Sequence, residues 1–124
     1  MVVSPVVLQS VTPTQIAGTV AGLALFLSLT AHLAARNVLG DVPIRRAFVV
    51  GPVPAVIAVV FVAFEIPAFV TIPVALAADA TVLKFVYGRD LRVTAFVLLI
   101  HVVVSILLAV VLFGTVLLVL SAPI

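Results

Sequence analysis

Two ionisable residues, Asp79 and His101, lie inside long apolar stretches of this 124-residue sequence. They stand eleven residues on either side of Asp90, which falls in a short polar segment between two apolar runs. If these runs form an antiparallel pair of helices, a rise of about 1.5 Å per residue places both side chains about 13 to 16 Å from the turn. An ionisable group at that depth in a membrane costs at least about 2.5 kcal/mol, so each of the two needs a partner or a function.

A carboxylate and an imidazole at the same depth can exchange a proton, which is the chemistry of a proton relay. On a helical wheel Ser105 falls within about 40° of His101, so it is a candidate third member of such a relay. The alternative is that Asp79 and His101 form one neutral hydrogen-bonded pair that fixes the register of two helices. We favour this structural interpretation over transport.

Two further polar residues are peripheral candidates for a relay. His32 lies one turn before Arg36, where it can reach the hydrated interface without any function. Glu65 lies at the end of the second apolar run beside Pro67, where it caps the next helix or meets water. Between Glu65 and the pair only Thr71 and water could bridge a proton path. The region is otherwise apolar, which argues against a continuous relay.

Motifs that indicate catalysis are missing from the sequence. The chain has no Cys, which excludes disulfides, thiolate metal sites and a Cys nucleophile. It contains no HExxH, GxSxG or P-loop motif. A metal site would need Asp79, His101 and a third ligand that the sequence does not identify. We therefore expect no catalytic, cofactor-binding or metal-binding residue, and no enzyme activity.

The composition shows what kind of environment surrounds these residues. Hydrophobic residues make up 66% of the chain and charged residues 8%, and the mean hydropathy is +1.58. A water-soluble domain carries roughly a quarter of its residues charged, so a soluble globule is excluded. Each crossing of a hydrocarbon core of roughly 30 Å takes about 20 residues of helix, so the chain is long enough for about four spans.

Four continuous apolar runs predict an all-α membrane protein with a single transmembrane domain over residues 1–124. The runs do not alternate between apolar and polar residues, which excludes strands. Short connections predict an up-down-up-down antiparallel four-helix bundle. Prolines inside the second and third runs predict kinks at Pro52, Pro54 and Pro73. The expected helices cover about 14–36, 42–64, 67–87 and 91–120.

Small residues recur at a spacing that favours helix packing. Gly18 and Gly22 form a GxxxG pattern in the first run, and Gly51 and Ala55 lie four residues apart in the second. Small residues at this spacing let helix backbones approach closely. The simpler interpretation is a contact between the first two helices within the chain, and the alternative is a contact between copies in a homo-oligomer. We favour the contact within the chain, because the pattern is common in spanning helices.

The basic residues flank only two of the three connections between the runs. Lys and Arg in short loops are retained on the cytoplasmic side of a membrane. This predicts that connections 36–46 and 84–92 are cytoplasmic and that both termini are outside. The one-sided distribution also argues against a dual-topology antiparallel dimer. The basic residues are Arg36, Arg45, Arg46, Lys84, Arg89 and Arg92.

Two short stretches carry a resemblance to known proteins. Residues 30–43 read TAHLAARNVLGDVP, and residues 51–54 read GPVP. In these two stretches the chain resembles small four-helix integral membrane proteins of halophilic archaea that have no assigned function. The resemblance implies a multi-pass protein of the cell membrane, and it implies no activity.

Together these features predict a non-enzymatic structural or accessory component of the cell membrane. The alternative is a proton-coupled carrier or channel subunit for a small solute or ion, in which Asp79 and His101 exchange protons. The expected partners are the lipid bilayer and either a second copy of the chain or another membrane subunit. Nucleic acid is not expected as a partner, because the six basic residues are spread over short connecting segments.

Overall fold

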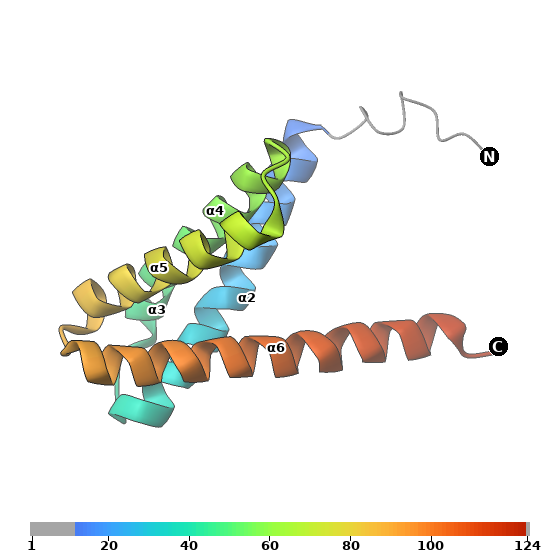
Figure 1. The fold of residues 1–124 in the computed structure, drawn as a ribbon. Helices are drawn as coiled ribbons and strands as arrows, with labels where there is room; N and C mark the ends of the chain where they lie inside the picture. Colours follow the sequence, from blue (N-terminus) through green and yellow to red (C-terminus); the bar gives the residue numbers. More distant parts are fainter. Residues whose placement is uncertain (1–11, 124) are drawn as a thin grey trace.

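The structure, a computed structural model, describes residues 12–123, so both ends of the expected 1–124 domain lie outside the described residues. Every regular element within this range is an α-helix, and the range contains no strand. The helices are α2 (Pro13–Leu39), α3 (Ile44–Val50), α4 (Pro52–Ala63), α5 (Ala68–Tyr87) and α6 (Leu91–Ser121) (Figure 1).

Four helical stretches are long and apolar enough to cross a membrane, namely α2, α3 together with α4, α5, and α6. Their mean hydropathies lie between 1.7 and 3.1. The all-α prediction is confirmed, and the length and composition of the four helices indicate a multi-pass membrane protein. The helices begin and end within a few residues of the expected ranges, because the polar segments that interrupt the apolar runs coincide with the turns.

Local sequence sets the helix ends. Thr12 begins α2 with a capping box: its Oγ1 accepts from Gln15 N at 3.1 Å, and its N–H donates to Gln15 Oε1 at 2.9 Å. Asp90 begins α6 by accepting from Val93 N at 2.9 Å. Gly88 ends α5 in the left-handed conformation, with φ 64°. The caps at Gly88 and Asp90 fix the turn about which α5 and α6 fold back.

The second expected helix is interrupted at Gly51, where α3 gives way to α4. Pro52 and Pro54 have no N–H to donate to the preceding turn, so they break the hydrogen bonding of the helix. Gly51 itself keeps helical dihedral angles, φ −57° and ψ −43°. Pro73 lies inside α5, and the helix continues through it.

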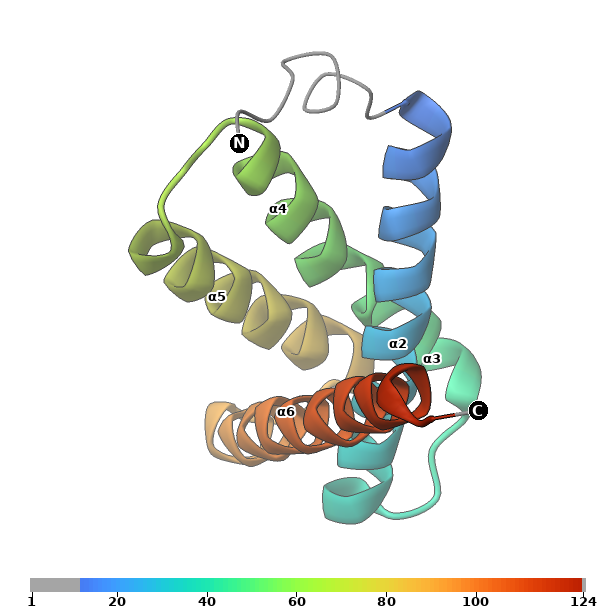
Figure 2. The same cartoon turned by 90° about the vertical axis from the view of Figure 1, so that its right-hand side faces the viewer.

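One end of the molecule contains the core, which we call the packed end. Helix α2 contacts α3, α4 and α6, and α5 contacts the same three helices (Figure 2). The core cluster includes four fully buried alanines, which allow close approach of the backbones there. The buried hydrophobic residues of the packed end are Ala31, Ala34, Ala35, Ala47, Val50, Leu83, Tyr87 and Val97.

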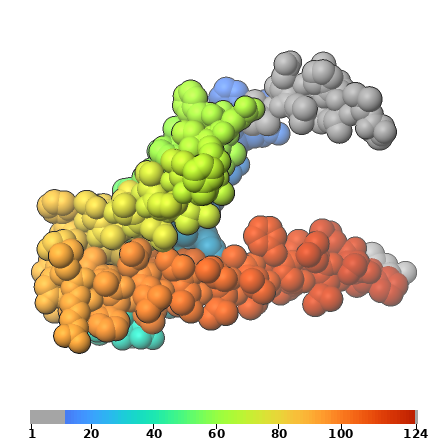
Figure 3. Space-filling view, viewed as in Figure 1, coloured from blue at the N-terminus to red at the C-terminus, as the bar shows by residue number. Residues whose placement is uncertain are grey.

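At the other end, α6 diverges from α2, α4 and α5, as the ribbon in Figure 1 and the space-filling view in Figure 3 show. We call residues 13–23 of α2, 56–63 of α4 and 106–121 of α6 the open end. None of these residues is buried. The side chains of the open end are mostly large and apolar, so lipid is the environment that suits them.

Candidate functional site

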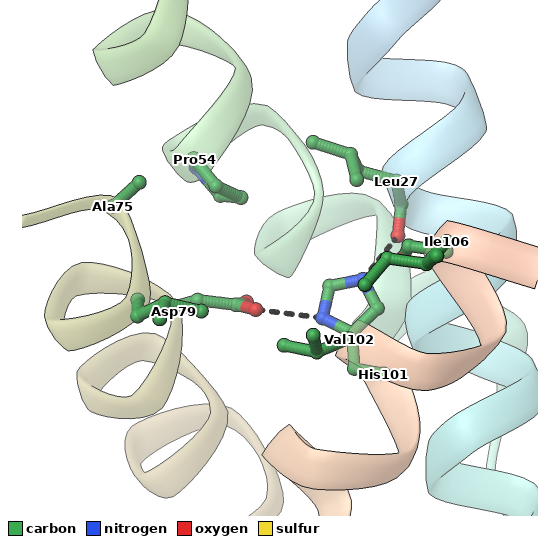
Figure 4. A pocket seen from close by; sticks show the side chains of 9 residues that line it. Leu27, Pro54, Ala75, Asp79, His101, Val102 and Ile106 are labelled. Atoms are coloured by element: carbon green, nitrogen blue, oxygen red, sulfur yellow. Dashed lines mark hydrogen bonds and ion pairs between the residues drawn. The ribbon is translucent and has the colours of Figure 1, made fainter. Parts of the chain in front are cut away.

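The structure brings Asp79 of α5 and His101 of α6 into direct contact. The two residues are 4% and 2% exposed, and His101 Nδ1 lies 2.6 Å from Asp79 Oδ2 (Figure 4). Asp79 lies near the middle of α5 and His101 about a third of the way along α6, eleven residues before and after Asp90. The contact therefore joins α5 to α6 deep within the protein.

The other ring nitrogen of His101 faces α2. Nε2 lies 3.0 Å from Thr30 Oγ1 and 3.2 Å from the Leu27 carbonyl oxygen. Ser105, one turn further along α6, donates to Thr30 Oγ1 at 2.9 Å. His101 thus joins three helices, with Asp79 on one side and Thr30 on the other.

The types of donor and acceptor limit where the protons of this network lie. The Leu27 carbonyl oxygen can only accept, so Nε2 carries a proton when it bonds to this oxygen. A second proton then lies between Nδ1 and Asp79 Oδ2, and the pair has no net charge whichever of the two atoms holds it. The two hydrogen bonds of the ring therefore need two protons, one on Nε2 and one between Nδ1 and Asp79 Oδ2.

Beside the pair lies a small cavity of about 170 Å³. Its walls come from four helices, and they include Leu27, Pro54, Ala75 and Ile106 as well as the pair (Figure 4). The Oδ1 atom of Asp79 is buried and has no hydrogen-bond partner among residues 12–123. One carboxylate oxygen is therefore engaged by His101, and the other remains unsatisfied.

The peripheral candidates lie apart from this network. Glu65 is exposed in the turn between α4 and α5, where it has a positive φ of 57°. His32 is half-buried, and its Nδ1 has no partner among the described residues. Thr71 donates to the backbone oxygens of Ile66 and Pro67 at 3.3 and 3.2 Å. No hydrogen bond among residues 12–123 links any of these groups to the pair.

The four small residues singled out in the sequence behave differently. Gly51 is buried, and a Cβ atom added there would collide with Ser28 Oγ and with the backbone of α2. Ala55 is fully buried. Gly18 and Gly22 are exposed, with open space where a side chain would project. The expected contact between the first two helices is thus made at Gly51 and not at the GxxxG pattern, because Ile16, Thr19 and Leu23 form the wall of α2 that faces α4 there.

Thr30 and the Leu27 carbonyl oxygen belong to the site, although the sequence did not predict them. Thr30 lies ten residues before Gly40, the C-cap of α2, and His101 lies ten residues after Leu91, where α6 begins. Thr30 thus lies at the same depth as Asp79 and His101, and its distance from the end of α2 is a signal that could have predicted it. A main-chain acceptor such as Leu27 O leaves no trace in the residue type.

The described part of the chain holds no group of three or more His, Cys, Asp or Glu residues that could bind a metal ion. What the fold and the site define is a membrane protein with four helices of spanning length, three of which are joined by one buried polar network. The chain belongs to a family of unknown function, DUF7473, whose sequence model matches residues 10–123. No curated protein and no solved structure matches the chain.

Proposed function

We propose that this protein is a non-enzymatic structural or accessory component of the cell membrane, and that its buried polar network fixes the helices relative to one another. The observation that carries the proposal is that the two ring nitrogens of His101 bond to different helices, Nδ1 to α5 and Nε2 to α2. Hydrogen bonds between membrane helices stabilise by about 0.6 to 2 kcal/mol each, and they depend on helix rotation. Such a network gives three helices one defined packing.

The proposal includes a topology and a location. We propose an up-down-up-down antiparallel bundle with connections 36–46 and 84–92 in the cytoplasm and both termini outside, in an archaeal cell membrane. Short connections and the one-sided basic residues support the topology, and the resemblance at residues 30–43 supports the source. Because the chain has no Cys, single variants Asp41→Cys and Glu65→Cys test the topology directly. A membrane-impermeant thiol reagent added to intact cells should label the second variant and not the first.

A second candidate function is a proton-coupled carrier or channel subunit. The specific observation in its favour is the unpartnered Oδ1 of Asp79 beside a cavity in the middle of the helices. A solute or water molecule that donates to Oδ1 would satisfy this oxygen. Against this function stand the apolar walls of the cavity and the absence, among residues 12–123, of polar links from the pair to Glu65 or His32.

Proton flux in liposomes separates the two functions. The purified protein is reconstituted, a pH gradient is imposed, and the wild type is compared with Asp79→Asn and with empty liposomes. Asparagine keeps the shape of the side chain and can donate to Nδ1, but it cannot exchange a proton with His101. If the protein is a structural component, neither the wild type nor Asp79→Asn gives proton flux above that of empty liposomes. Proton flux in the wild type that Asp79→Asn abolishes would establish the carrier.

A further inference from the structure

All the Lys and Arg residues of the chain lie at the packed end, and we call this group the basic surface. Helices α2 and α5 end there, and α3 and α6 begin there. Val42 in the first connection and Val86 before the second pack against the same core cluster, which places both connections at one end. The basic surface consists of Arg36, Arg45, Arg46, Lys84, Arg89 and Arg92.

The charge of the basic surface is not neutralised by the protein. All six side chains are exposed. Among residues 12–123 the one ion pair is that between Asp79 and His101, so none of the six forms a salt bridge there. Two acidic residues, Asp41 and Asp90, lie in the same connections, and Asp90 already accepts from the backbone at the start of α6. A net positive charge therefore faces outward from this end.

An apolar groove begins beside the basic surface. A cavity of about 250 Å³ lies between α5 and α6, and Lys84 lines it together with apolar residues that include Phe85, Leu91 and Leu98. Lys84 and Leu91 are close to the ends of their helices, whereas Leu98 is two turns further along α6. The groove thus combines one ammonium group near the helix ends with apolar walls that run toward the middle of the helices.

We propose that the basic surface binds the phosphate diester groups of anionic phospholipids in the leaflet that it faces, with a hydrocarbon chain of one lipid in the groove between α5 and α6. The ends of membrane-spanning helices lie at the level of the headgroups. Guanidinium groups bind phosphate oxygens through paired hydrogen bonds, and an ammonium group attracts them as a point charge. A soluble anion would use the positive charge but leave the apolar groove empty.

Spin-labelled lipids test the proposal on the whole protein in phosphatidylcholine bilayers. Labelled phosphatidylglycerol and labelled phosphatidylcholine are compared by the fraction whose motion the protein restricts. The wild type should retain phosphatidylglycerol several-fold more than phosphatidylcholine. Lys84→Gln should lower this preference by up to about fivefold, which corresponds to the roughly 1 kcal/mol contributed by one basic side chain near an anionic surface.

Three further variants distinguish the contribution of the charge from that of the groove. Glu65→Gln changes the net charge by one unit away from the basic surface and should leave the preference unchanged. Ala95→Phe fills the groove without changing the charge and should reduce retention of phosphatidylglycerol. Lys84→Arg keeps the positive charge and should keep the retention of phosphatidylglycerol. Equal retention of the two lipids by the wild type would overturn the proposal. Competition by millimolar inorganic phosphate would also overturn it, because the site would then be one for a free anion.

Discussion

The packed end and the open end contrast in how their helices are held. At the packed end, alanines and Gly51 allow close approach, and the network of Asp79, His101 and Thr30 joins α2, α5 and α6 at its border. At the open end no residue is buried, and large apolar side chains face outward. Lipid tails are as apolar as leucine, so apolar side chains alone do not drive helices together in a membrane. Small residues and polar contacts do, and among residues 12–123 the buried small residues and the side-chain hydrogen bonds between helices lie at the packed end and its border.

The largest expected effect comes from removing the imidazole that joins three helices. His101→Leu leaves Asp79 buried without its partner, and we expect a loss of about 3 kcal/mol in the free energy of unfolding. The measurement is unfolding in mixed micelles with increasing SDS, followed by pulse proteolysis. His32→Leu is the matched control and should change stability by less than about 0.5 kcal/mol. Equal losses in the two variants would show that the network does not hold the packed end.

A substitution of one glycine at each end sharpens the comparison. Gly51→Ala introduces a methyl group into the contact with Ser28, and we expect a loss of about 1 to 3 kcal/mol in the same assay. Gly18→Ala meets open space and replaces glycine by a better helix former, so stability should stay equal or rise. If Gly18→Ala lowered stability or dissociated an oligomer, the open end would be an interface between copies of the chain.

Threonine hydroxyls allow the same comparison with a smaller expected effect. Thr30→Val removes the group that bonds to His101 and Ser105, and it should cost about 1 kcal/mol. Thr115→Val removes a hydroxyl at the open end that bonds only to the Val111 carbonyl oxygen of its own helix at 2.7 Å. Its stability should match that of the wild type. Equal effects of the two substitutions would argue against a special role for the network.

The smallest expected effect is a gain at the packed end. Tyr87 is 7% exposed, and its hydroxyl is buried without a hydrogen-bond partner among residues 12–123. Tyr87→Phe removes this unsatisfied group and keeps the ring in the core, so stability should rise by up to about 1 kcal/mol. Thermal unfolding of the two proteins in one detergent is sufficient to measure it. A clear loss would mean that the hydroxyl has a partner such as a bound lipid.

Most of the fold could be predicted from hydropathy, because a continuous apolar run of about 20 residues has few alternatives to a spanning helix. Glycine and the N-capping residues Thr12 and Asp90 mark the helix ends. The divergence of α6 could not be predicted in the same way. Beyond Ser105 its sequence is apolar on nearly all sides, so no face indicates which part packs on protein and which part on lipid.

The site could be predicted only as far as depth along each helix determines it. Equal spacing from Asp90 places Asp79 and His101 at one level, but rotation decides whether two side chains at one level meet. The rotation of the helices about their axes depends here on the backbone of α2. This backbone supplies the Leu27 carbonyl oxygen that His101 contacts, and Gly51 packs closely against it. These are tertiary contacts without a local pattern. For the same reason a GxxxG pattern does not reveal which neighbour it faces.

The central claim is that the contact between Asp79 and His101 stabilises the packing of the helices, and a double-mutant cycle tests it most directly. The cycle measures the free energy of unfolding of Asp79→Leu, His101→Leu and the variant with both substitutions. We predict that the double substitution costs less than the sum of the single ones by about 1 to 3 kcal/mol, because each single change leaves a buried polar partner unpaired. Additive losses within about 0.5 kcal/mol would contradict the claim.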